Sequence, residues 1–268
     1  MFWNFILPVL VTVLGFMLLG PIGGGIVMIL AILFMVYRAR VNLYILRANK
    51  AYDKADVDGA MRLLEKAYQT NQMSAQQKVY YGYLALRCGK PDKAERLFQS
   101  ALQSKPDEKT KMQAKSNMAL VLWKRKQLSE AIELMEEVFE HYKTTAVYGS
   151  LGYFYILSGD IEKALKFNEE AYEFNSDDNV IRDNLGQIYY LKNDFDKAEE
   201  IYEELLRRQP EFPVPYYNYA LVKLAKGDKE AAMDLMRKAL TYRFTYIAGV
   251  SEDQIRTKLE LLETEGEA

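Results

Sequence analysis

Hydrophobic residues along most of this chain recur at intervals of three and four positions, which places them on one face of a helix. Leu151 and Tyr155 are one such pair. Three of the apolar stretches end at a Gly or Asn that is followed at once by an acidic residue: Gly159-Asp160, Asn193-Asp194 and Gly227-Asp228. Because Gly ends helices and Asp begins them, the pattern predicts short helices joined by tight turns. The expected fold class is all-α.

The helical pattern is repeated along the chain with a nearly constant period. Residues 193–202, NDFDKAEEIY, have the same order of small, polar and apolar residues as residues 159–168, GDIEKALKFN. An alanine marks the centre of each copy, with spacings of 34, 37, 33, 34 and 34 residues: Ala60, Ala94, Ala131, Ala164, Ala198 and Ala232. Such a period indicates stacked helix pairs, each of which buries its apolar face against its neighbours.

These copies resemble the tetratricopeptide repeat (TPR) family, whose pattern has Leu, Gly or Ala and an aromatic residue in the first helix, then Ala and an aromatic in the second. The fifth copy follows this pattern closely, with Leu185, Gly186, Tyr189, Ala198, Tyr202 and Pro210. The first and third copies are weaker matches, and Asn168 and Met236 stand where the family has an aromatic residue. The resemblance implies a right-handed α-solenoid of about six helix pairs, which we place at residues 38–250.

The end of the chain predicts one further helix. Ser251 and Gln254 have the spacing of a capping box, and an apolar stripe follows at Ile255, Leu259 and Leu262. We therefore expect residues 251–268 to form a capping helix and an acidic tail, because the last repeat of a solenoid needs a polar outer face.

Residues 1–37 contain no charged side chain and predict a membrane anchor. As a single helix this stretch would be about 55 Å long, whereas the hydrocarbon core of a bilayer is roughly 30 Å thick. The sequence GPIGGG at 20–25 predicts a turn that divides it into a helical hairpin, although a single tilted span is the alternative. A signal peptide is disfavoured because no positive residue precedes Arg38.

Positive residues crowd the C-terminal flank of this apolar segment: Arg38, Arg40, Arg47, Lys50 and Lys54. The positive-inside rule then places the repeats in the cytoplasm. The compact arrangement of anchor and repeats is typical of a protein of the bacterial inner (plasma) membrane. Residues 26–54 contain neither Pro nor Gly, which predicts one continuous helix from the membrane segment into the first repeat.

The composition argues against catalysis and against cofactor, metal or nucleic-acid binding. Cys88 and His141 are the only residues of their types, so the sequence contains no metal motif and no nucleophile with a histidine partner nearby. The net charge of −2 is unlike the basic surface of nucleic-acid-binding proteins. We predict that the protein is not an enzyme.

The family resemblance also implies a binding site. In TPR proteins the first helix of each repeat lines a concave groove, where an Asn at the sixth position can hold the backbone of a peptide. Here that position is occupied by Asn117, Asn184 and Asn218, and aromatic residues at the ninth and twelfth positions share the same face: Tyr83, Trp123, Tyr153 and Tyr190. An amide offers both a donor and an acceptor to an extended peptide. The alternative is that these amides bind no ligand and the aromatic side chains pack within the protein.

Two functions remain from the sequence. The first is a membrane-tethered scaffold or adaptor that binds a protein or extended peptide in its groove and contacts the bilayer through residues 1–37. The second is a tethered quality-control or envelope-assembly regulator, since the layout resembles that of a bacterial lipopolysaccharide-assembly protein with an anchor and TPR repeats. That family also has a four-cysteine metal site, which a chain with one cysteine lacks.

Overall fold

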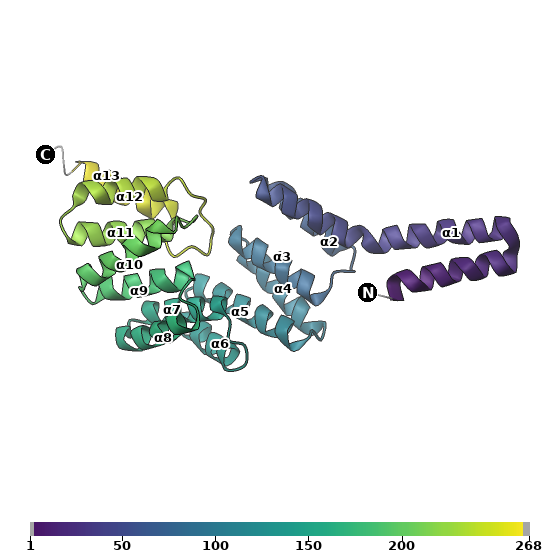
Figure 1. Cartoon of the computed structure of the whole chain (residues 1–268), viewed down its shortest axis with the longest axis horizontal. Helices are drawn as coiled ribbons and strands as arrows, with labels where there is room; N and C mark the ends of the chain where they lie inside the picture. The colour runs from purple at the N-terminus through teal and green to yellow at the C-terminus, as the bar shows by residue number, and fades with distance from the viewer. Residues whose placement is uncertain (1–2, 265–268) are drawn as a thin grey trace. The chain divides into compact units, whose positions relative to one another are not determined.

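A computed structural model of the chain describes residues 3–264 and contains thirteen helices (Figure 1). Their bounds are α1 Trp3–Asp53, α2 Val57–Gln69, α3 Ala75–Arg87, α4 Pro91–Gln103, α5 Glu108–Lys124, α6 Leu128–His141, α7 Thr145–Ser158, α8 Ile161–Phe174, α9 Asn179–Leu191, α10 Phe195–Arg207, α11 Val214–Ala225, α12 Lys229–Ala239 and α13 Glu252–Thr264. The chain divides into two compact units, Met1–Lys78 and Val79–Ala268.

In the first unit, α1 is a hairpin of two helical arms that meet at Gly20. This residue has φ 67° and ψ −173°, a conformation outside the helical region that glycine adopts without steric cost. The turn is shorter than the predicted stretch 20–25, because the second arm already begins at Pro21. Proline suits the first position of a helix, where an amide hydrogen would have no partner in the helix. From there α1 has no further break up to Asp53, in agreement with the predicted continuous helix.

Glycines allow the two arms of α1 to approach closely. A methyl group built on Gly15 would lie 2.9 Å from Cβ of Val27, and one built on Gly24 would lie 2.3 Å from the Phe16 ring. The end of α1 then packs against α2 as the first helix pair, in which Ala48 is completely buried.

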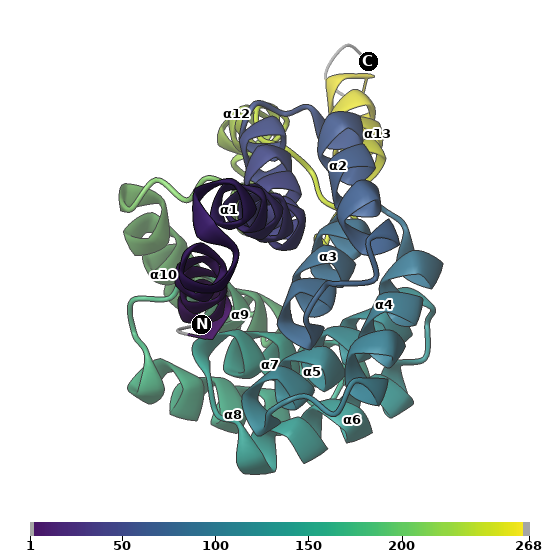
Figure 2. The same ribbon diagram turned by 90° about the vertical axis from the view of Figure 1, so that its right-hand side faces the viewer.

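In the second unit, helices pack as successive pairs: α3 with α4, α5 with α6, α7 with α8, α9 with α10, and α11 with α12. The first helices of neighbouring pairs are also in contact: α7 packs against α9, and α9 packs against α11. Figure 2 shows α3, α5 and α7 on the inner side of this unit and α4, α6 and α8 on the outer side. The predicted all-α solenoid of six helix pairs is confirmed, with α13 packed against α12 as an additional helix.

The predicted helix starts are confirmed at the level of hydrogen bonds. The carboxylates of Asp160, Asp194 and Asp228 accept from backbone N–H groups three residues on, at 3.0, 3.2 and 3.1 Å. Ser251 and Gln254 form the predicted capping box: the Ser251 N–H donates to Oε1 of Gln254 at 2.8 Å, and the Gln254 N–H to Oγ of Ser251 at 3.2 Å.

The C-terminal boundaries differ from the prediction in one respect. The last repeat helix, α12, ends at Ala239, before the predicted solenoid limit of 250, and residues 241–250 form a loop. Residues 265–268 of the predicted acidic tail lie outside the described residues.

Candidate peptide-binding surface

The first helices are positioned by a close contact inside each repeat. A small residue on the first helix is followed sixteen positions later by a larger one on the second, and the three glycines of this series lie directly against their partners: Ala48–Leu64, Gly82–Phe98, Ala119–Met135, Gly152–Asn168, Gly186–Tyr202 and Ala220–Met236. A methyl group on Gly82 would lie 2.4 Å from the Phe98 ring, and one on Gly186 would lie 2.6 Å from the Tyr202 ring. Glycine is therefore required opposite the aromatic rings, whereas alanine stands opposite methionine.

Trp123 and Tyr153 are brought together by neighbouring repeats. Their rings meet edge to face at 5.5 Å, and Trp123 also contacts Phe154 at 5.8 Å. Burial raises the pKa of the Tyr153 hydroxyl to about 12, with a smaller contribution from the carboxylate of Asp183. Trp123 and Tyr153 therefore pack against the apolar core of the third and fourth repeats, in which Phe154 is completely buried, and both rings remain half-buried.

Asn184 lies beneath the surface at a joint between repeats. It is 1% exposed, and its amide nitrogen donates to the Gly149 carbonyl and to Oδ1 of Asn168, both at 3.0 Å. The amide of Asn168 in turn donates to the carbonyls of Gly152 and Ala164. The Asn that replaces the family's aromatic residue at position 168 therefore completes a buried polar network between α7, α8 and α9.

Asn218 makes the corresponding contact one repeat later. Its amide donates to Oδ1 of Asp183 at 3.0 Å, and the Tyr202 hydroxyl donates to the Asp183 backbone carbonyl at 3.1 Å. Burial raises the pKa of Asp183 to about 7, although the Asn218 hydrogen bond opposes this shift. Asp183 is not among the predicted site residues, because nothing in its sequence neighbourhood marks it as buried.

The other predicted site residues are more accessible. Asn117 on α5 is half-buried, and its amide makes no hydrogen bond to any described residue. Tyr83 is half-buried on α3, with the Arg87 guanidinium 5.8 Å from its ring. Tyr190 is half-buried on α9 and its ring packs at 5.9 Å against Phe195 of α10.

The inner loop, residues 241–250 between α12 and α13, is not among the predicted parts of the site. The N–H of Tyr246 donates to the carbonyl of Arg87 at the end of α3, at 3.0 Å. Its ring lies 4.9 Å from the Lys124 ammonium on α5, and a methyl group on Gly249 would lie 2.7 Å from the Tyr153 hydroxyl on α7. The signal in the sequence is the alternation of Tyr242, Phe244 and Tyr246, which is typical of an extended segment.

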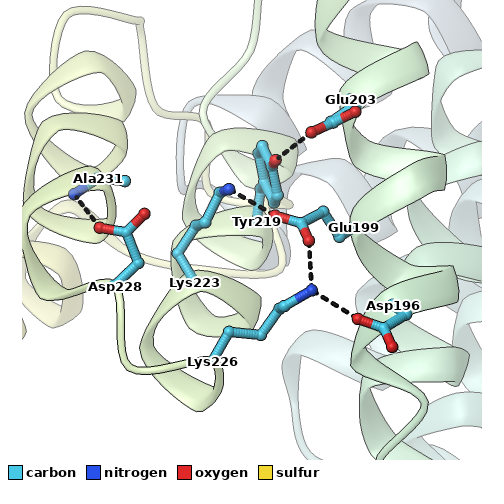
Figure 3. Close-up of polar contacts among 8 residues, drawn as sticks. All are labelled: Asp196, Glu199, Glu203, Tyr219, Lys223, Lys226, Asp228 and Ala231. Atoms are coloured by element: carbon cyan, nitrogen blue, oxygen red, sulfur yellow. Dashed lines mark hydrogen bonds and ion pairs between the residues drawn. The ribbon is translucent and has the colours of Figure 1, made fainter.

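Ion pairs link neighbouring repeats elsewhere in the second unit. The basic residue that caps the end of a first helix forms an ion pair with an acidic residue on the second helix of the preceding repeat. These pairs are Arg125–Asp92, Lys192–Glu162 and Lys226–Asp196. Figure 3 shows the last of these joints, where Glu199 accepts from both Lys223 and Lys226. These hydrogen bonds hold the pKa of Glu199 below its ordinary value, and the bond from Lys223 has the larger effect.

Comparisons with solved structures agree with this architecture. A thermophilic TPR protein of Thermus thermophilus is 20% identical, with a TM-score of 0.60 over 71% of this chain and 100% of its own. PilF of Pseudomonas aeruginosa is 15% identical, with a TM-score of 0.56 over 75% and 91% of the two chains. A TPR protein of Parabacteroides merdae is 17% identical, with a TM-score of 0.52 over 84% and 99%. At these identities the likeness concerns the fold.

Family models match most of the chain. The tetratricopeptide repeat-like domain matches residues 39–185 and a tetratricopeptide repeat matches residues 184–245. No curated protein matches the sequence. The predicted resemblance is confirmed, and the chain belongs to the tetratricopeptide repeat family of protein-interaction scaffolds.

Proposed function

We propose that this protein is a membrane-tethered TPR scaffold that binds a protein or extended peptide on the inner face of its repeats. The observation that carries the proposal is the surface of the α1 hairpin, whose large apolar side chains are exposed along both arms. Leu18 is 78% exposed and Ile22 is 83% exposed. A surface of this size needs a cover, since soluble proteins rarely leave extended apolar patches in water.

A bilayer fits this surface in length and chemistry. The first arm, residues 3–19, is about 25 Å long at 1.5 Å per residue, close to the roughly 30 Å of a hydrocarbon core. Its backbone groups are hydrogen-bonded within the helix, as a lipid environment requires. One helix of the described residues, α1, has the length and composition of a membrane-crossing segment.

The flank of the hairpin supports a cytoplasmic location for the repeats. The guanidinium of Arg40 lies 3.9 Å from the centre of the Tyr37 ring. Tyr and Arg are favoured side chains where a helix leaves the hydrocarbon region, and the positive residues that follow define the inner side. A hairpin would leave both termini on that side.

The inner face of the second unit offers the contacts that a peptide needs. TPR proteins bind proteins or peptides. We assign the wall of the site to the half-buried rings of Tyr83, Trp123, Tyr153 and Tyr190, with the Asn117 amide as a hydrogen-bonding group. Asn184 and Asn218 are engaged with neighbouring repeats, so we assign them the role of holding the wall in place.

Site-specific crosslinking in intact cells tests the binding site. A photoreactive amino acid at Tyr83, Trp123 or Tyr190 is expected to capture the same protein. The matched control is Phe174 on the second helix of the fourth repeat, which is 50% exposed. Equal capture from Phe174 would contradict the inner-face assignment. The identity of the captured protein separates a general adaptor from an envelope-assembly regulator.

Reporter fusions test the tether. Reporters before Met1 and after Ala268 are both expected to be active only in the cytoplasm. An external N-terminus with an internal C-terminus would replace the hairpin by a single span, and an external C-terminus would contradict the cytoplasmic location.

A further inference from the structure

We propose that the inner loop is a resident ligand of the scaffold, and that an external peptide occupies the inner face by displacing it. This inference rests on the proposed function, because it concerns the same surface. The loop leaves the sixth repeat after α12 and contacts the second, third and fourth repeats at Arg87, Lys124 and Tyr153. The wall assigned to a peptide is therefore partly covered by the chain itself.

The loop is anchored firmly at its two ends. The ring of Tyr242 stacks on that of Tyr216 at 5.0 Å, and their hydroxyl oxygens are 2.9 Å apart. Val250 is buried in one apolar cluster with Ile255 and Leu259 of α13. These contacts lie within the sixth repeat and the capping helix, so they do not depend on how the centre of the loop is placed.

The centre of the loop makes the contacts that an external peptide would make. The Tyr246 N–H donates to the Arg87 carbonyl in the last turn of α3, at 3.0 Å. The Tyr246 ring packs beside Gly89, where a methyl group would lie 3.7 Å from it, and near the ammonium of Lys124. Such a ring and cation attract each other through the negative face of the aromatic system.

The centre is also open to solvent. Tyr246 is 38% exposed, and Gly249 is exposed where it meets Tyr153. A turn closed by the Ala248 N–H and the Thr245 carbonyl, at 3.0 Å, shapes the segment between these two contacts. The centre can therefore leave the wall while Tyr242 and Val250 keep their places.

These contacts define the partner by its chemistry. The surface fits an extended peptide with an aromatic residue whose N–H is free, followed three positions later by a small residue, as Gly249 follows Tyr246. The small residue is needed because the Tyr153 hydroxyl leaves no room for a side chain. The contacts use a backbone N–H and an aromatic ring, so the peptide can be bound in the middle of a longer chain.

The test uses the loop's own sequence as the probe. A fluorescent peptide, TYRFTYIAGV, is titrated into the full-length protein in detergent and into a variant whose residues 245–249 are replaced by a Gly-Ser segment of equal length, which leaves Phe244 packed against the sixth repeat. We expect the variant to bind the peptide at least ten-fold more tightly than the unaltered protein. A peptide with Tyr246→Ala is expected to bind at least five-fold more weakly.

Two further variants locate the binding site. In the loop-replaced protein, Lys124→Ala is expected to weaken peptide binding about three-fold, because it removes the cation beside the ring. Lys109→Ala, on the exposed start of the same helix, removes the same charge and should leave binding unchanged.

The proposal would be overturned by equal binding to both proteins, or by no binding to a loop-replaced variant that keeps its helical content. If replacement of the whole segment unfolds the protein, Tyr246→Ala alone replaces it in the titration, with the same expected direction. The probe is part of this chain, so its result does not depend on the cellular crosslinking that tests the proposed function.

Discussion

The N–H of Tyr246 donates a hydrogen bond to the carbonyl oxygen of Arg87 at 3.0 Å, joining the loop after the sixth repeat to the end of the first helix of the second. Most contacts in a solenoid are between neighbouring repeats. This one skips the third, fourth and fifth repeats. It places a segment of the chain across the inner face to which we assign the peptide site.

The closeness of Gly249 to Tyr153 predicts how this contact can be broken. Gly249→Val would place a side chain against the Tyr153 hydroxyl, 2.7 Å from the first added carbon, and force the loop away. Hydrogen exchange at the Tyr246 amide is expected to accelerate at least ten-fold, while the amides of α7 and α9 keep their protection.

A graded pair of variants serves as the control. Gly249→Ala is expected to give a smaller acceleration, and adding Tyr153→Phe to it should restore part of the protection because the nearest atom is removed. Unchanged exchange in Gly249→Val would contradict the close contact.

The pairing of small and large residues predicts a coupled pair of mutations in the second repeat. Gly82→Ala should lower the free energy of unfolding by about 1–3 kcal/mol, because the added methyl group would lie 2.4 Å from the Phe98 ring. Combined with Phe98→Met, it should cost less than the sum of the two single changes, since alanine faces methionine in the third and sixth repeats. Urea denaturation measures all four proteins, and strict additivity would contradict the pairing.

Substitution of Asn184 is expected to affect stability, whereas substitution of Asn117 is expected to affect binding alone. Asn184→Ala removes a buried donor to Gly149 and Asn168 and should cost about 1–3 kcal/mol of unfolding free energy. Asn117→Ala should change the unfolding free energy by less than about 0.5 kcal/mol, since its amide makes no hydrogen bond within the described chain. If Asn117 contacts the partner, crosslinking from Trp123 should weaken in this variant alone. Equal losses of stability would contradict the structural distinction.

Asp183 predicts a pH dependence of stability with an unusual sign. Its pKa is raised to about 7 in the folded protein, from an ordinary value of 3.8 that applies when unfolded. Between these values the folded state binds more protons than the unfolded state, so this group makes stability fall as pH rises from about 4 to about 7. Its neighbours Asn218, Tyr202 and Tyr153 do not ionise in that range.

The measurement compares urea midpoints of the wild type and Asp183→Asn at pH 5 and pH 8. The variant keeps an acceptor for Asn218 and removes the titration, so its midpoint should fall less between the two pH values. Carboxylates with lowered pKa values, such as Glu136 and Glu199, titrate below this range and are the same in both proteins. Parallel pH profiles would contradict the burial of a titrating Asp183.

The joint in Figure 3 predicts a salt-dependent contribution to stability. Glu199→Gln weakens the attraction to both Lys223 and Lys226 and should lower the melting temperature in low salt. The expected cost is about 1 kcal/mol, because the Glu199 and Lys223 side chains are partly buried, each 20% exposed. The difference should largely vanish in about 1 M salt, where charges are screened. Asp196→Asn is the matched control, because its exposed carboxylate contacts Lys226 alone and should matter less. An equal loss of stability in low and high salt would indicate that Glu199 stabilises the joint by packing and not by its charge.

The repeats were predictable from the sequence because the information that specifies them is local. The sequence itself contains a period of about 34 residues, an acidic cap after Gly159, Asn193 and Gly227, and a Gly or Ala sixteen positions before a larger residue. The central GPIGGG of the uncharged stretch 1–37 favoured a hairpin over a single tilted span, and the Ser251–Gln254 spacing was sufficient to predict the start of α13.

The tertiary structure alone decided which of the predicted groups remain accessible. Asn117, Asn184 and Asn218 occupy the same repeat position, yet Asn184 and Asn218 bond to groups of the preceding repeat and Asn117 makes no such bond within the described residues. Only the folded chain therefore distinguishes the buried Asn184 from the half-buried Asn117. The inner loop is the clearest case. Its contacts join Tyr246 to Arg87 and Gly249 to Tyr153, residues far apart in sequence, and such contacts exist only once the stacked repeats have brought their first helices to one face.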